Sequence, residues 1–176
     1  GAWRDGKRHG HGEMEWADGS RYTGNWRNGE MHGSGTLVTS DGGRYEGEFT
    51  EGSFHGEGEY RWPDGTAYVG EWKNGVRHGV GYMEWGNGDY YEGEWQEGSP
   101  NGNGLMIWSD GTRYEGEWSA GEPHGYGTYE EPDGLLYEGE FADGRAVGGV
   151  LTVTSGEQYW ATMDENGDWQ WEQKIE

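Results

Sequence analysis

A pattern repeats every 23 residues along most of this chain, and this period limits the possible fold more than any other feature. One repeat, residues 68–81, reads Tyr-x-Gly-x-Trp, passes through a glycine-containing turn, and ends in His-Gly-x-Gly. The tyrosine that opens each full repeat recurs at Tyr22, Tyr45, Tyr68, Tyr91, Tyr114 and Tyr137. A fixed period of this length without insertions indicates a repeat architecture, in which each unit packs against its neighbours.

Each repeat has the pattern of two short strands joined by turns. Residues 45–49 alternate aromatic, acidic and small side chains, and residues 55–62 alternate again, which is typical of strands with one apolar and one polar face. Polar segments with glycine separate these runs, and Asp64-Gly65 suits a tight turn. No repeat has room for a crossover helix, so consecutive strands should pair antiparallel. The sequence therefore predicts an all-β fold, an elongated, curved, single-layer antiparallel β-meander of tandem hairpins.

The two ends of the chain depart from the regular repeat. The array should occupy residues 1–149, with a partial first repeat. Trp160 stands 23 residues after Tyr137, where the next tyrosine would fall. Residues 150–176 are predicted to form a capping hairpin or strands, because terminal repeats need an atypical cap over the exposed edge. The open first hairpin at Trp3 suggests end-to-end self-association.

The composition supports a folded repeat protein despite first appearances. Leu, Ile, Val and Phe together make up about a tenth of the chain, and the formal net charge is −22. That combination alone would indicate disorder. The 12 Trp and 12 Tyr residues overturn that interpretation, because each large ring can bury roughly 150–250 Å². The 38 glycines sit at fixed repeat positions and not in a flexible run.

The aromatic columns fall on one predicted face, and the acidic columns fall on the other. Two interpretations of these rings stay open. Either the rings form the core alone, or, because a single-layer sheet has nothing else to cover its apolar face, they also form a ligand groove. The predicted groove residues are Tyr68, Trp72, Trp85, Tyr91, Trp95, Trp108, Tyr114 and Trp118.

The pattern Tyr-x-Gly-x-Trp-x-x-Gly-x-x-His-Gly-x-Gly, closed by Asp-Gly, resembles the MORN (membrane occupation and recognition nexus) repeat. The departures are local: Asn101 and Val147 replace the histidine of two repeats, and Asn87-Gly88 replaces one Asp-Gly. The resemblance implies an elongated, curved sheet of hairpins and a non-catalytic scaffold that binds partner proteins, often through a concave groove. Lipid binding is also attributed to some members. Other members carry these repeats beside catalytic domains, so a repeat segment of a larger enzyme is a second alternative.

Repeated polar columns do not make a catalytic or metal site. The histidine column consists of His9, His32, His55, His78 and His124. Equivalent positions in adjacent hairpins lie about 9–10 Å apart, too far to share a zinc ion, so each imidazole should hydrogen-bond in its own turn. The glutamate columns are regular and exposed, and they lack the singular pair that catalysis needs. We expect no enzyme activity, no metal and no cofactor.

The acidic surplus of the chain limits the classes of partner that it can bind. Residues 86–176 hold three basic side chains against twenty acidic ones, whereas anionic lipids and nucleic acids require basic clusters. We therefore expect neither nucleic acid nor anionic membrane lipid, but a protein or peptide with apolar anchors and basic flanks. The alternative is a glycan-binding or divalent-cation-dependent surface-binding protein. The absence of cysteine fits a reducing compartment, and we expect a cytoplasmic location.

Overall fold

The structure is a computed structural model that describes residues 1–175, at position 172 for the backbone only. Its contacts divide the chain into two units, Gly1–Gly86 and Asn87–Glu176. Within residues 1–175, no helix is long and apolar enough to cross a membrane.

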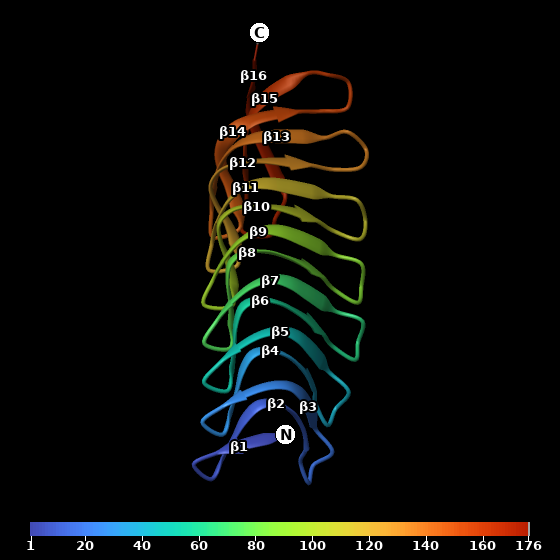
Figure 1. The fold of residues 1–176 in the computed structure, drawn as a ribbon. Coiled ribbons are helices and arrows are strands. Elements are labelled where there is room, and N and C mark those ends of the chain that lie inside the picture. Colours follow the sequence, from blue (N-terminus) through green and yellow to red (C-terminus); the bar gives the residue numbers. More distant parts are fainter. Residues whose placement is uncertain (176) are drawn as a thin grey trace. The chain divides into compact units, whose positions relative to one another are not determined.

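Unit 1 contains eight strands, each paired antiparallel with the next along the chain (Figure 1). They are β1 (Ala2–Arg4), β2 (Lys7–Glu15), β3 (Arg21–Arg27), β4 (Glu30–Val38), β5 (Arg44–Thr50), β6 (Ser53–Arg61), β7 (Ala67–Lys73) and β8 (Val76–Glu84). Unit 2 follows the same plan. Its strands are β9 (Tyr90–Gln96), β10 (Ser99–Ile107), β11 (Arg113–Ser119), β12 (Glu122–Glu130), β13 (Leu136–Ala142), β14 (Arg145–Thr152), β15 (Gln158–Met163) and β16 (Trp169–Lys174). The predicted all-β antiparallel meander of hairpins is confirmed.

Two kinds of tight turn alternate along each unit. In the first, both central residues have positive φ, as at Asn74 (51°) and Gly75 (84°), which is the geometry of a type I′ hairpin turn. In the second, an Asx side chain accepts the backbone N–H two residues on, as Asp64 Oδ1 does from Thr66 at 2.9 Å. Asn87 accepts from Asp89 in the same way, at 3.1 Å. The departure from Asp-Gly at this turn therefore preserves its geometry.

A β-bulge interrupts the two long strands of each full repeat. In β11 and β12 the register shifts between Gly116 and Trp118, and Gly125 takes a φ of +61°. The carboxylate of Glu117 covers the bulge, because its Oε1 accepts the backbone N–H of Tyr126 at 3.1 Å. A Cβ on Gly125 would lie 2.6 Å from Glu117 Oε2. This glutamate column, expected to be merely solvated, therefore stabilises the bulges.

The core is a chain of edge-to-face aromatic rings in each unit. Tyr114 stacks edge-on to Trp118 at 5.2 Å and to Phe141 of the next hairpin at 4.9 Å. Its hydroxyl donates to the backbone oxygen of Glu117 at 2.8 Å, and Trp118 Nε1 donates to Gly104 O at 3.1 Å. The same contacts recur in unit 1, where Trp72 Nε1 donates to Gly58 O at 3.1 Å. Rings and backbone together thus link consecutive hairpins.

Paired glycines on facing strands make room for each tyrosine. Gly116 lies opposite Gly127, and a Cβ on Gly116 would lie 2.5 Å from Gly127 Cα and 2.9 Å from the Tyr114 hydroxyl. A separation this short between Cβ and backbone forces the strands apart. The glycine pair is therefore what allows the ring of Tyr114 to lie across the backbone of both strands.

The last hairpins break the 23-residue register. Gly149, not residue 150, pairs with Gly139, so the stretch between the bulge and this glycine is one residue shorter than in the other repeats. A one-residue slip in a strand exchanges its two faces. Tyr159 accordingly pairs with Leu151 on the side of the tyrosine column, and Trp160 pairs with Val150 on the opposite side. Trp160 therefore does not lie in the tyrosine column, although it follows Tyr137 by 23 residues.

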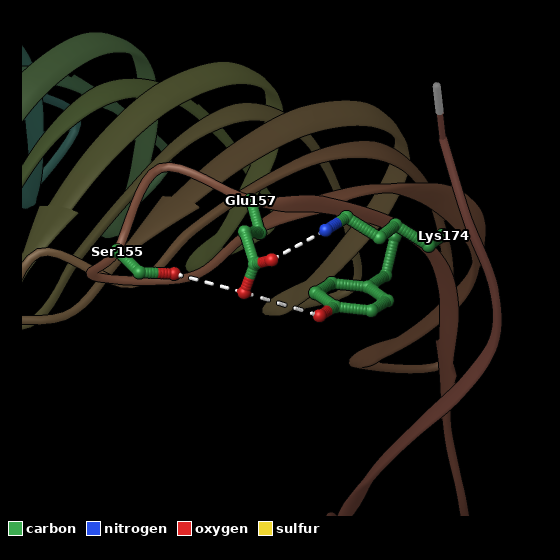
Figure 2. Close-up of polar contacts among 4 residues, drawn as sticks. Ser155, Glu157 and Lys174 are labelled. Atoms are coloured by element: carbon green, nitrogen blue, oxygen red, sulfur yellow. Dashed lines mark hydrogen bonds and ion pairs between the residues drawn. The ribbon is translucent and has the colours of Figure 1, made fainter.

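The final strands pack over the last repeat of unit 2. The ring of Trp169 lies 5.0 Å from Tyr137 and 6.0 Å from Tyr129. Glu157 accepts a hydrogen bond from Ser155 Oγ at 3.2 Å and forms an ion pair with Lys174 of β16 (Figure 2). These contacts lower the pKa of Glu157, mainly through the Lys174 ammonium. The division into an array over residues 1–149 and a cap over residues 150–176 stays a prediction.

Candidate functional site

We call the side of each unit that carries the repeat tyrosines its aromatic face, and the opposite side its carboxylate face. Six of the eight predicted groove residues are buried in the aromatic core and present almost no surface to a partner. Their exposed fractions are 0% for Tyr68, Tyr91 and Tyr114, 3% for Trp95, and 6% for Trp72 and Trp118. Trp85 and Trp108 are partly exposed. A groove lined by all eight rings is therefore not present at the surface, because these rings fill the space over the glycine pairs.

Burial also determines the ionisation of the core tyrosines. Desolvation raises the pKa of Tyr22 and of Tyr114 to about 12, and it raises the pKa of Tyr45, Tyr68 and Tyr91 as well. Each hydroxyl donates to the backbone oxygen three residues on, as Tyr91 does to Glu94 at 3.0 Å. The phenols are neutral structural donors at neutral pH, and none is poised as an acid or a nucleophile.

A small hollow lies on the aromatic face of unit 2. It measures about 240 Å³ and is lined by Trp108, Asp110, Thr112 and Tyr129. The rings of Trp108 and Tyr129 lie 6.5 Å apart at an angle of 57°, so they form a wedge and not a stack. Asp110 sits at its edge, and hydrogen bonds from Thr112 lower the pKa of its carboxyl group. The hollow thus combines two aromatic walls with one negative charge.

Larger hollows lie on the carboxylate faces. In unit 1, a hollow of about 490 Å³ is lined by His11, Thr23, Gly24, Asn25, Ser34, Gly35, Thr36, Glu46, Gly47 and Glu48. In unit 2, one of about 500 Å³ is lined by Glu92, Gly93, Asn103, Gly104, Leu105, Glu115 and Gly116. Sequence reasoning missed both hollows. The available signal was the glycine pair itself, which leaves a strip of bare backbone between rows of side chains.

The histidines differ from expectation at two positions. Nδ1 of His9 and Nδ1 of His55 are buried and lack a hydrogen-bond partner, although each imidazole was expected to hydrogen-bond in its own turn. Over the part of the chain that the structure describes, no three His, Cys, Asp or Glu side chains gather closely enough to hold a metal ion.

Solved structures with a similar fold include the G-box domain of the microcephaly protein CPAP. It shares 11% identity at a TM-score of 0.52, over 94% of this chain and 100% of that one. The TCP10 domain of Danio rerio CPAP aligns at 11% identity and a TM-score of 0.49, over 89% and 80% of the two chains. The SAS-4 TCP domain of Drosophila melanogaster, solved in complex with a proline-rich motif of Ana2, aligns at 12% identity and 0.48, over 85% and 88%. At such identities the first likeness concerns the fold alone, and the lower-scoring two add nothing to it.

No curated protein matches the sequence significantly. The family model described as MORN repeat matches seven consecutive stretches, residues 1–21, 22–44, 45–67, 68–90, 91–113, 114–135 and 137–148. These stretches cover most of the chain, which therefore belongs to the MORN-repeat family.

Proposed function

We propose that this chain is a non-catalytic protein-interaction scaffold whose aromatic face takes a segment of a partner protein. The observation that carries the proposal is the hollow at Trp108 and Tyr129, where aromatic surface stays open beside an otherwise closed core. Two converging rings suit one apolar side chain of a partner. Of the eight predicted groove residues, Trp108 is the one that lines this hollow and would contact the partner.

The electrostatics favour a partner with basic residues beside its apolar anchor. Asp110 keeps its charge at neutral pH, since hydrogen bonds from Thr112 hold the pKa of its carboxyl group below the usual range. Unit 2 carries twenty acidic residues against three basic ones. A field of this sign speeds the encounter with a cationic segment and weakens with added salt.

The test uses a fluorescein-labelled peptide with one central tryptophan flanked by lysines, followed by fluorescence anisotropy. The variant Trp108→Ala should weaken its binding by about tenfold, which corresponds to ~1.4 kcal/mol. The matched control is Trp85→Ala, at the equivalent position of unit 1, and it should bind as the unchanged protein does. Circular dichroism verifies that both variants are folded. Equal losses in the two variants, or none in either, would contradict the proposed site.

A glycan array with the same protein separates the proposal from its main rival. Sugar binding that is lost in Trp108→Ala, with no peptide binding, would favour a glycan-binding surface instead. A thermal shift on addition of calcium would favour a cation-dependent one. A cytoplasmic location and end-to-end self-association stay predictions.

A further inference from the structure

The carboxylate face of unit 2 carries two exposed aromatic rings that the repeat pattern does not require. Tyr126 is 60% exposed and Trp160 is 47% exposed. The positions equivalent to Tyr126 in the other repeats are His11, Ser34, Glu57, Val80 and Asn103. An aromatic ring at this position is therefore no requirement of the fold.

Trp160 reaches this face because of the shortened hairpin. The one-residue loss before Gly149 turns Trp160 to the carboxylate face, where it pairs with Val150. A Cβ on Gly148 would lie 3.8 Å from Trp160 Cζ2, so the edge of the indole lies over bare backbone. The residue as a whole stays 47% exposed.

Two glutamates lie between the rings on the same face. Glu140 pairs directly with Tyr126, and Glu138 pairs with Val150, the neighbour of Trp160. Both side chains are exposed. Among residues 1–175, no ion pair engages either carboxylate, whereas Glu115 of the same face pairs with Arg113 at 3.3 Å.

We propose that this surface, formed by Tyr126, Glu138, Glu140 and Trp160, is a second docking site and binds an extended protein segment with arginine at every second position. Arginine suits all four side chains, because its guanidinium stacks on aromatic rings and pairs with carboxylates through two hydrogen bonds. The surface lies opposite the hollow at Trp108, so it adds to the proposed function and does not depend on it.

The spacing of the strands gives the arginine period. Tyr126 is on β12 and Trp160 is on β15, three strand spacings or about 14 Å away across the sheet, and the pairing offsets them by two residues along the strands. Alternate side chains of an extended segment are about 6.6 Å apart, so the first and fifth residues of a segment crossing the strands reach the two rings. The third residue then lies over Glu138 and Glu140. The segment thus reads arginine, any residue, arginine, any residue, arginine.

The partner class follows from the charge of the surface. A segment of acidic or neutral residues would leave the two carboxylates unpaired under a covering chain, which costs free energy. A cationic segment removes this cost, and the surplus of acidic residues in unit 2 attracts it over several ångströms. Its binding should weaken as the salt concentration rises.

The probes are two fluorescein-labelled peptides of identical composition. One alternates three arginines with two threonines, and the other places its three arginines in a row. The alternating peptide should bind about tenfold more tightly, because only its register reaches both rings and both carboxylates together. Equal affinities would show that the protein attracts cationic peptides by bulk charge alone, and would overturn the proposal.

Three variants locate the site. Tyr126→Ser combined with Trp160→Ser should remove the preference for the alternating peptide, and Glu138→Gln combined with Glu140→Gln should weaken both peptides about tenfold. The matched control, Val80→Ser, replaces an exposed side chain on the carboxylate face of unit 1 and should change neither affinity. Because all five positions are exposed, the variants should fold, and circular dichroism checks this.

A failure of this second docking site can be distinguished from a failure of the proposed function at Trp108. Trp108→Ala should leave binding of the alternating peptide unchanged, since that residue lies on the other face. The second site is wrong if Trp108→Ala abolishes this binding and the double variant Tyr126→Ser, Trp160→Ser does not. Binding of a glycan that depends on Trp160, with no response to either peptide, would also overturn it.

Discussion

Tyr114 and Tyr126 lie on neighbouring strands of unit 2, yet they have opposite environments. Tyr114 belongs to the repeat pattern, is fully buried, and donates to the backbone of Glu117. Tyr126 is a departure from the pattern and is 60% exposed on the other face. The comparison teaches that residues shared by all repeats hold the sheet together, while the departures from the pattern supply surface chemistry.

The largest expected effect concerns the ionisation of the buried tyrosines. Burial raises the pKa of Tyr114 to about 12, whereas an unfolded tyrosine has a pKa near 10. The unfolded chain therefore holds fewer protons between these values, and stability falls as the pH rises through this window. The stability that the buried, protonated tyrosines contribute is fully present below pH ~10. Since six repeat tyrosines act together, the protein should unfold cooperatively on approaching pH ~12.

Circular dichroism as a function of pH measures this alkaline transition, and phenolate absorbance reports the ionisation. The buried tyrosines, whose pKa values desolvation raises, should ionise only as the fold is lost. Two results would contradict the predicted alkaline unfolding. One is a fold that persists well above pH ~12, and the other is a single simple titration of all tyrosines near pH ~10.

The substitution Gly116→Ala should be the most damaging single change. Its Cβ would lie 2.5 Å from Gly127 Cα and 2.6 Å from Tyr126 O, so the backbone must move, at a cost of roughly 2–3 kcal/mol. Gly148→Ala is the control, because its Cβ meets only the Trp160 ring at 3.8 Å. Urea unfolding should show a much lower midpoint for the first variant alone. Similar midpoints would mean that the strands are not closely paired at Gly116.

Replacing each tyrosine by phenylalanine tests the two environments directly. Tyr114→Phe removes the hydrogen bond to Glu117 O, 2.8 Å long, and should cost ~1–2 kcal/mol because that carbonyl loses its donor within the core. Tyr126→Phe should leave the free energy of unfolding unchanged within about 0.5 kcal/mol. Thermal denaturation compares the pair, and an equal loss in both would show that the hydroxyl of Tyr114 is not structural.

The smallest effect distinguishes two glutamates of the carboxylate face. Glu117→Ala removes the acceptor for Tyr126 N–H at the bulge and should lower the unfolding free energy by up to about 1 kcal/mol. Glu115→Ala removes only an exposed ion pair with Arg113, which should matter less than about 0.5 kcal/mol. Urea unfolding in low and high salt checks the difference, since screening affects the ion pair more. A greater loss in Glu115→Ala would reverse the assignment.

The fold was predictable because the period, the strand alternation and the turns agree with one another. Tyr45 and Phe49 fall on one face by the two-residue alternation, and Asp64-Gly65 forms its turn as expected. What alternation cannot reveal is how deeply a ring lies. A single-layer sheet suggested open rings, but the glycines at 116 and 127 let Tyr114 lie flat on the backbone, where neighbouring rings enclose it.

The candidate site was therefore predicted only in part. Trp85 and Trp108 keep exposed surface because each lies just past the end of its strand, β8 or β10, beyond the buried repeat tyrosines. The bulge also escaped the sequence reasoning, although the glycine after each histidine carried its signal, as Gly79 with a φ of +59° shows. Glu71, whose carboxylate caps that bulge, was consequently expected to serve only as a solvated charge.

The missing residue in the β13–β14 hairpin has a consequence for how such arrays diversify. The β13–β14 hairpin is one residue shorter than the others before Gly149, and this exchanges the two faces for the positions of the next strand. Ala161 is fully buried and Tyr159 is partly buried on one face of β15, while Trp160 is exposed on the other. A meander can therefore gain a new external face when one residue is lost from a hairpin. The condition is that alternate side chains of the following strand suit both the buried face and the exposed face.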